Sequence, residues 1–256
     1  MLQKFSDNIW DLKEGVVTAI FPRRCPVCDD IVESIKIRNG KLIIGQLIHD
    51  NCKKKIKYVR GATCMKCGKP LGQADSSKEF CYDCNRVRHV YDRGFAVFDY
   101  RSISGSVYKF KYMGRQEYAR FYARAVYERY GKAIRSLGID AIIPVPMFKG
   151  KQLTRGYNQA EVLAKMIGRE LGIPVYTDAV VRNKNTLPMK ELDARGRRNN
   201  LKKAFNITRN DVKFKCILII DDIYTTGSTI DEIAHEFRIA GTRKIYFLTL
   251  AIGQTT

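Results

Sequence analysis

Long hydrophobic runs are missing from this sequence of 256 residues. A membrane-spanning helix needs about 20 apolar residues in succession, and no stretch approaches that length. A secretory signal peptide is also missing, because residues 1–5 (MLQKF) lead into an amphipathic segment that contains Trp10 and Glu14. We therefore expect a soluble, cytoplasmic protein that begins with an amphipathic helix over residues 1–20.

Acidic residues are few, since 26 Asp and Glu stand against 46 Lys and Arg and leave a formal net charge of +20. A surplus of this size attracts polyanions, either nucleic acid or a phosphorylated small molecule. A basic surface can also serve solubility alone. Charge by itself therefore leaves nucleic-acid binding open.

The sequence has no cysteine pattern typical of disulfides. Seven of the eight cysteines stand in Cys-x-x-Cys or His-x-x-Cys spacing, which in a cytoplasmic protein indicates metal ligands. Because Zn²⁺ takes four such groups tetrahedrally, eight candidate ligands predict two structural Zn²⁺ ions. The candidates are Cys25, Cys28, His49, Cys52, Cys64, Cys67, Cys81 and Cys84. The remaining cysteine, Cys216, lies in an apolar run and is interpreted as a small buried hydrophobe.

Two ways of sharing these ligands are open. Sequential pairing joins the first pair to the second and the third to the fourth, whereas a cross-brace joins the first to the third. The apolar stretch over residues 41–45, between the first two pairs, is typical of a ribbon strand and favours the sequential option. The basic run over residues 53–60, between the two predicted sites, is either a nucleic-acid contact or a solvated connector.

The segment over residues 216–230 (CILIIDDIYTTGSTI) carries the strongest functional pattern. An apolar strand ends in Asp221 and Asp222, a hydroxyl-rich turn follows, and a helix begins. Backbone N–H groups of such a turn and the helix dipole attract a phosphate, while the carboxylates suit ribose hydroxyls or Mg²⁺. The Gly-x-x-x-x-Gly-Lys-Ser/Thr pattern of P-loops is absent from this segment. The segment therefore predicts a site for a phosphorylated sugar.

This segment is the signature of type I phosphoribosyltransferases, and the chain from residue 25 to residue 250 resembles the ComF competence-protein family, which includes GntX-like proteins. The resemblance also rests on residues 111–112 (KY), 143–146 (IPVP), 155–159 (RGYNQ) and 197–201 (RRNNL). Two positions depart from the family pattern. The family usually has Cys where His49 stands, a change that keeps a zinc ligand, and often Gln where Met189 stands, so Met189 is given no role.

The resemblance implies an α/β fold with a type I phosphoribosyltransferase-like, mostly parallel sheet and helices on both faces. This domain would span residues 91–256, after a double zinc-ribbon module over residues 21–90. Periodicity alone also predicts alternating strands and helices in this part of the chain. The expected strands are 95–100, 141–143, 175–176, 180–181, 216–220 and 245–250, and the expected helices are 102–113, 118–137, 157–171 and 228–240.

The ligand implied by the resemblance is phosphoribosyl pyrophosphate (PRPP), bound with Mg²⁺. Asp221 and Asp222 would position the ribose, and residues 182–201 would act as a mobile flap that carries Arg195, Arg197 and Arg198. Arg197 is placed with the two acids in the catalytic set. The turn would hold the 5′-phosphate through Thr225, Thr226, Gly227, Ser228 and Thr229, and Lys111, Arg155 and Arg197, which match family motifs, would steady the departing pyrophosphate. Arg115 near Lys111, and Lys149 and Lys151 near Arg155, are further basic residues expected at this edge of the sheet.

The resemblance also implies a role in DNA uptake during natural transformation, with single-stranded DNA as a partner and competence helicase or DNA-processing proteins as further candidates. Aromatic side chains among basic ones suit stacking of bases. The candidates are Tyr108, Phe110, Tyr112, Tyr118, Tyr122 and Tyr127, among Lys109, Lys111, Arg115, Arg120 and Arg124. Because several of these aromatics have helical spacing, a core-facing role is the alternative for them.

An element that would recognise the acceptor of a phosphoribosyl group is missing from the sequence. No short aromatic-plus-lysine segment marks a base pocket, and no N-terminal cysteine indicates a glutaminase. Three hypotheses follow: a phosphoribosyltransferase, with or without a role in DNA uptake; a PRPP-responsive protein that binds single-stranded DNA without catalysis; and a PRPP-sensing regulator that acts through a protein partner.

Overall fold

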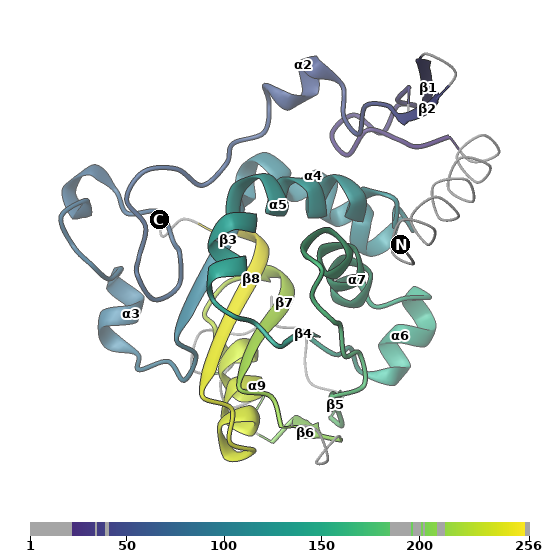
Figure 1. Ribbon diagram of the computed structural model, residues 1–256. Coiled ribbons are helices and arrows are strands. Elements are labelled where there is room, and N and C mark those ends of the chain that lie inside the picture. Colours follow the sequence, from purple (N-terminus) through teal and green to yellow (C-terminus); the bar gives the residue numbers. More distant parts are fainter. Residues whose placement is uncertain are drawn as a thin grey trace. The chain divides into compact units, whose positions relative to one another are not determined.

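Figure 1 shows the computed structural model of the chain. The structure describes residues 22–33, 35–38, 41–184, 203–208 and 213–253, together with Gly196 and Leu201. The chain divides into two compact units, Met1–Ile56 and Lys57–Thr256, which are described separately. The predicted N-terminal helix lies outside the described residues, and the domain boundaries expected from the sequence stay a prediction.

The first unit contains a short antiparallel ribbon and a single helical turn. Strands β1 (Ile35–Arg38) and β2 (Lys41–Ile44) pair in antiparallel register, as the apolar stretch over residues 41–45 predicted. A tight turn precedes them, in which the Asp29 N–H donates to the carbonyl of Cys25 over 2.9 Å. The helix α2 (Asp50–Lys53) follows His49 directly. This turn and this helix carry the two ligand pairs of the first predicted zinc site.

The second unit is built on a four-stranded parallel sheet. Its strands are β3 (Arg93–Asp99), β4 (Ala141–Pro144), β7 (Cys216–Tyr224) and β8 (Lys244–Ile252), and they lie side by side in the order β3-β8-β7-β4 (Figure 1). Every residue of β4 and the first five of β7 are buried. Such apolar runs are typical of strands covered on both faces.

Helices cover both faces of this sheet. α4 (Tyr100–Tyr112), α5 (Tyr118–Ser136) and α7 (Gln159–Leu171) contact strands of the sheet, and α5 packs along α7. On the other face, α9 (Ser228–Ile239) buries Ile233 and Phe237 in one cluster with Ile217 and Ile219. Because side chains alternate along a strand, Leu218 and Ile220 face the first three helices.

Smaller elements complete the unit. A helix α6 (Lys149–Arg155) follows β4, and β5 (Val180–Arg182) pairs antiparallel with β6 (Phe205–Ile207). Around the second group of cysteines lie a 3₁₀ turn, Gln73–Asp75, and the short helix α3 (Tyr82–Arg86). In the described part of the chain, no helix combines the length and the apolar character that crossing a membrane requires.

The expected fold class is confirmed, with differences at particular elements. The strand expected over residues 216–220 continues to Tyr224, because its ladder with β8 runs on to the pair Tyr224–Ile252. The helix expected from residue 102 begins at Tyr100, because Asp99 accepts the Arg101 N–H over 2.9 Å and so caps it. The helix α6 was not predicted, since it buries no side chain and has no apolar periodicity.

Candidate functional site

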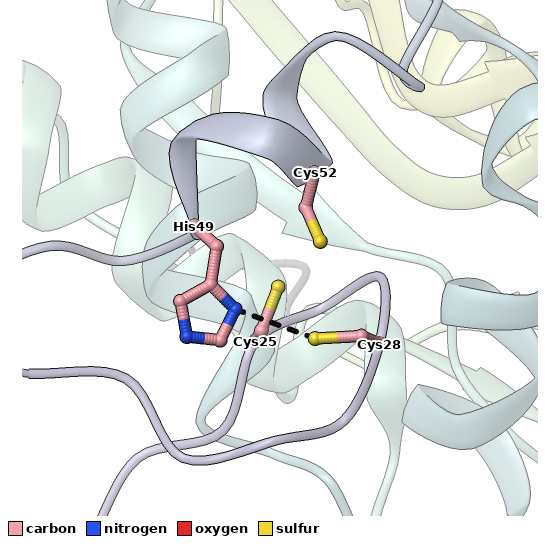
Figure 2. Close-up of side chains that lie close together, drawn as sticks. All are labelled: Cys25, Cys28, His49 and Cys52. Atoms are coloured by element: carbon pink, nitrogen blue, oxygen red, sulfur yellow. Dashed lines mark hydrogen bonds between the residues drawn. The ribbon is translucent and has the colours of Figure 1, made fainter.

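Four side chains of the first unit form a metal-binding cluster. The ligand atoms of Cys25, Cys28, His49 and Cys52 all lie within 4.8 Å of one another, and Figure 2 shows them pointing toward a common centre. His49 Nε2 lies 3.0 Å from the carbonyl oxygen of Ile31, which can only accept, so Nε2 carries the proton. His49 Nδ1, which lies 3.3 Å from Cys28 Sγ, is then left with its lone pair directed at the cluster. This donor set fits a structural Zn²⁺.

A second cluster gathers Cys64, Cys67, Cys81 and Cys84 within the same 4.8 Å limit. The structure thus groups the eight predicted ligands sequentially and leaves Cys216 buried elsewhere, in β7. Four thiolates around one Zn²⁺ carry a net charge of −2, and the buried Lys69, which pairs with Asp83 over 2.6 Å, places a cation beside them. This arrangement also fits a closed structural zinc site.

A cavity of about 470 Å³ opens at the carboxyl edge of the parallel sheet. This is the edge at which ligands bind in α/β proteins. The residues around it come from α4, the loop after β4, α6, α7, β5, β7, the turn before α9, the first turn of α9 and the end of β8. Its charged and hydroxyl-bearing side chains are Tyr100, Lys111, Lys151, Arg155, Arg182, Asp221, Asp222, Thr225 and Thr229.

Asp222 is the centre of a polar network in this cavity. Lys111 Nζ lies 2.8 Å from Asp222 Oδ1, and the amide nitrogen of Gln159 donates to Asp222 Oδ2 over 2.7 Å. Arg155 donates in turn to the Gln159 side-chain oxygen over 2.7 Å. Burial lowers the pKa of Lys111, but the charge of Asp222 and their hydrogen bond outweigh it and raise that pKa overall. The Lys111 ammonium therefore stays charged beside the acids.

Asp221 has a different environment from Asp222. Burial, together with the neighbouring charge of Asp222, raises the pKa of Asp221 to about 7. The backbone N–H of Asp222 donates to Asp221 Oδ1 over 2.8 Å and opposes this rise. Arg182 also opposes it, and burial lowers the pKa of Arg182 itself. A carboxyl that titrates near neutral pH at a cavity is a candidate for metal or substrate binding.

The hydroxyl-rich turn lies at the rim of the cavity. Thr225 and Thr229 line the cavity, whereas Thr226, Gly227 and Ser228 belong to the turn without lining it. Gly227 has φ of 78°, and its position directly before Ser228 makes it the N-cap of α9. Because Thr225 and Thr229 line the cavity on either side of this cap, the N-terminus of α9, which can attract anions, lies at this end of the cavity.

Most of the site predicted from the sequence is brought together. Asp221, Asp222, Lys111 and Arg155 face one cavity, with Lys151 beside them. Arg195, Arg197 and Arg198, and with them most of the predicted flap, lie outside the described residues. Gln159 and Arg182 are among the cavity residues that received no predicted role. In the sequence, Gln159 was only part of a motif and Arg182 only the border of the predicted flap. The polar amide of Gln159 at the first turn of α7 and the position of Arg182 in the short strand β5 are the sequence features that could have indicated a role at the site.

Five of the six predicted aromatic residues divide into a buried and an exposed group, and Tyr127 is intermediate in burial. Phe110, Tyr118 and Tyr122 are buried in the core, so the core-facing alternative holds for these three. Tyr108 and Tyr112 are 59 % and 60 % exposed, and their ring centroids lie 5.1 Å apart. Arg155, Tyr112 and Lys151 also line an open groove of about 500 Å³ beside the first cavity.

Comparison with known proteins places this arrangement in a family. Residues 16–85 match the family model "Double zinc ribbon domain". The chain is 33% identical over 206 residues to competence protein F of Haemophilus influenzae, covering 78% of this chain and 88% of that protein. It is 32% identical over 187 residues to the DNA utilization protein YhgH of Salmonella typhi, covering 72% of this chain and 80% of that protein.

Among solved structures, a purine phosphoribosyltransferase from Pyrococcus horikoshii is similar with a TM-score of 0.31 and 20% identity, over 54% of this chain and 73% of that one. The fold class is drawn from the strand order and the two cysteine clusters described above, and this similarity is not used for it. With more than two thirds of competence protein F covered at 33% identity, the chain belongs to the competence protein F (ComF) family.

Proposed function

We propose that this protein binds PRPP with Mg²⁺ in the cavity at the carboxyl edge of the sheet and acts on single-stranded DNA in DNA uptake. The observation that carries the first part is the distribution of charge in the cavity. Two adjacent acids share the cavity with a hydroxyl-rich helix N-terminus and with three cations, Lys111, Arg155 and Arg182.

Each part of PRPP has a matching part of the cavity. The 5′-phosphate suits Thr225, Thr229 and the N–H groups at the start of α9. The ribose hydroxyls suit the carboxylates of Asp221 and Asp222. The pyrophosphate suits Arg155 and Lys111, because arginine offers paired donors to phosphate oxygens and lysine a compact charge. Bound Mg²⁺ would neutralise part of the pyrophosphate charge and would be held through the acids.

The same residues suit a phosphoribosyl transfer. The bond between the anomeric carbon and the pyrophosphate oxygen breaks, and its electron pair leaves with pyrophosphate. A nitrogen nucleophile of the acceptor then forms the new bond with its lone pair and releases a proton to water. Asp221 and Asp222 would stabilise the positive charge on the sugar, and Arg155 would steady the leaving pyrophosphate.

Contact with single-stranded DNA is supported by the exposed pair Tyr108 and Tyr112. Arg155 lies 4.6 Å from the centroid of the Tyr112 ring, so an aromatic face and a cation occur together. An exposed aromatic of this kind can stack on any base, and the net charge of +20 favours the strand's phosphates. The names of the relatives, competence protein F and DNA utilization protein, agree with such a role.

Binding of PRPP is tested by thermal unfolding with PRPP and Mg²⁺. At a ligand concentration of about 100 times Kd, the free energy of unfolding rises by about 2.7 kcal/mol, which corresponds to roughly 5–10 °C in Tm for a unit of this size. The variant Asp221→Asn with Asp222→Asn should lose the shift. A matched control neutralises two exposed acids, Asp75→Asn with Glu128→Gln, and should keep it. Absence of any shift in the wild-type protein would show that the cavity is not a PRPP site.

Turnover and DNA binding need separate measurements. Pyrophosphate release in the presence of nitrogen nucleophiles, lost in the double Asn variant, would establish transfer; PRPP binding without release would leave a non-catalytic, PRPP-responsive protein. For DNA, fluorescence anisotropy of a labelled single strand should weaken with Tyr112→Ala. Tyr82 provides the control, because it is equally exposed and also lies beside an arginine, Arg86. Equal effects of both substitutions would remove the argument for this surface.

A further inference from the structure

Residues 89–91, here called the brace, join the second zinc ribbon to the start of α9. His89 Nδ1 lies 2.6 Å from Asp231 Oδ2, and the Val90 N–H donates to Asp231 Oδ1 over 2.9 Å. Asp231 stands in the first turn of α9. Both oxygens of this carboxylate are therefore held by the brace, which fixes the N-terminal end of the helix.

The brace also holds the last residue of β7. The hydroxyl groups of Tyr91 and Tyr224 lie 2.7 Å apart, and both side chains are buried. The Phe247 ring stacks on Tyr224 with centroids 5.0 Å apart and meets Tyr91 edge-on at 4.7 Å. Because Tyr224 directly precedes the hydroxyl-rich turn and Asp231 follows it, the brace contacts the chain on both sides of the turn.

The turn itself packs against these side chains. A methyl group added at Gly227 would lie 2.7 Å from the Tyr224 hydroxyl oxygen and 3.1 Å from His89 Cε1. The side chain of His89 is only 1% exposed. The His89 ring therefore packs directly against the turn at Gly227, although His89 is not among the residues that line the cavity.

On its other side the brace contacts the second zinc ribbon. Lys66, between two ligand cysteines, places Nζ 5.3 Å from the Tyr91 ring centroid, and the His89 ring stacks on Tyr91 at 4.9 Å. The buried cysteines of that ribbon belong to one core cluster with Tyr91 and with Ile230 of α9. A contiguous set of packed side chains therefore runs from the zinc ligands to the turn.

We propose that His89 is a positioning residue for the phosphate turn, through which the second zinc ribbon sets the affinity of the site for the phosphate end of its ligand. The inference rests on the proposed binding of PRPP. It follows because N–H groups hold a phosphate only when they point at it, and a small displacement of such a group costs much of its effect.

The test compares two ligands that each represent one end of PRPP. Isothermal titration calorimetry on the zinc-loaded full chain measures ribose 5-phosphate and, separately, pyrophosphate with Mg²⁺. His89→Phe keeps a stacking ring and loses the contact with Asp231, so ribose 5-phosphate should bind about tenfold more weakly, the effect of removing a group that orients a ligand. Pyrophosphate affinity should stay unchanged. His89→Asn, which places an amide donor near the position of Nδ1, should restore the affinity for ribose 5-phosphate.

The outcomes separate this inference from the proposed function. If the wild-type protein binds PRPP and His89→Phe binds ribose 5-phosphate equally well, the inference is overturned, even if the variant melts at a lower temperature. Equal weakening of both ligands would also overturn it, since it would indicate general damage to the fold. A wild-type protein that binds no PRPP would refute the proposed function instead. Should His89→Phe not fold, Tyr91→Phe removes only the hydroxyl contact with Tyr224 and should show the same selective loss.

Discussion

The ion pair between Lys111 and Asp222 provides the sharpest test of the cavity's electrostatics. The side chain of Lys111 is 18% exposed and that of Asp222 is 7% exposed, and the two charges lie 2.8 Å apart. Replacing Lys111 by Met keeps the length of the side chain and removes the charge. Asp222 is then left with the Gln159 amide and with the neighbouring Asp221. Breaking a buried pair from one side should lower the free energy of unfolding by about 3 kcal/mol, because a buried carboxylate loses its cation.

A second ion pair supplies the control. Lys165 and Glu161 lie 2.6 Å apart on α7, at least as close as Lys111 and Asp222, but their side chains are 58% and 27% exposed. Exposed pairs of this kind contribute about 0.2–1 kcal/mol. Lys165→Met should therefore change Tm by at most about 4 °C, against roughly 6–12 °C for Lys111→Met, if the second unit unfolds in one step.

The assay is chemical or thermal unfolding of the zinc-loaded protein, followed by near-ultraviolet circular dichroism. A double-mutant cycle with Asp222→Asn isolates the pair itself, and the coupling energy should be about 2 kcal/mol. If Lys111→Met and Lys165→Met destabilise the protein equally, burial does not increase the contribution of the Lys111–Asp222 pair to the free energy of unfolding, and the prediction is refuted. Additive effects of Lys111→Met and Asp222→Asn would lead to the same conclusion.

Three further predictions concern pH, the pyrophosphate end and zinc. The pKa of Asp221 in the folded chain, about 7, lies above its value in the unfolded chain of about 4, so the contribution of this group to stability falls as pH rises through that window. The Tm of the wild-type protein, measured relative to that of Asp221→Asn, should therefore fall as pH rises from about 4 to about 7. Arg155→Lys keeps the positive charge but should still lower the affinity for PRPP measured by calorimetry, because lysine cannot offer paired donors to phosphate oxygens. An unchanged affinity would exclude a two-donor contact between Arg155 and the pyrophosphate. Removal of Zn²⁺ by a chelator should lower Tm, and adding Zn²⁺ back should restore it. A Tm that does not change with the chelator would contradict structural zinc.

Patterns that are local in sequence predicted much of the fold and several of the residues that meet at the cavity. The strand that ends in Asp221 and Asp222, with the turn and helix after it, is one contiguous segment, so the sequence could be interpreted without knowing the rest of the chain. The buried strand β4 and the helices α5 and α7 likewise have strong apolar patterns. The grouping of the zinc ligands was open, and proximity in the fold was needed to choose between the two pairings.

Other contacts between distant segments, which no family motif marked, were not predicted. Gln159 and Asp222 are 63 positions apart, and His89 and Asp231 are 142 positions apart, so no spacing rule relates them. The same limit applies to the aromatic residues of α4 and α5. Tyr112 and Tyr122 both stand among basic residues, and only the packing of the helices leaves the first exposed and buries the second.

The two zinc ribbons have similar ligand spacing but different surroundings. The first cluster lies in a unit that ends at Ile56, whereas the cysteines of the second belong to the core that also holds the sheet and α9. Because a structural zinc stabilises whatever packs around its ligands, loss of the second zinc should disturb the phosphate turn through the brace. A cysteine substitution in the second cluster should therefore weaken ligand binding at the cavity. The contribution of each ribbon is set by its packing partners, which the spacing of its cysteines does not reveal.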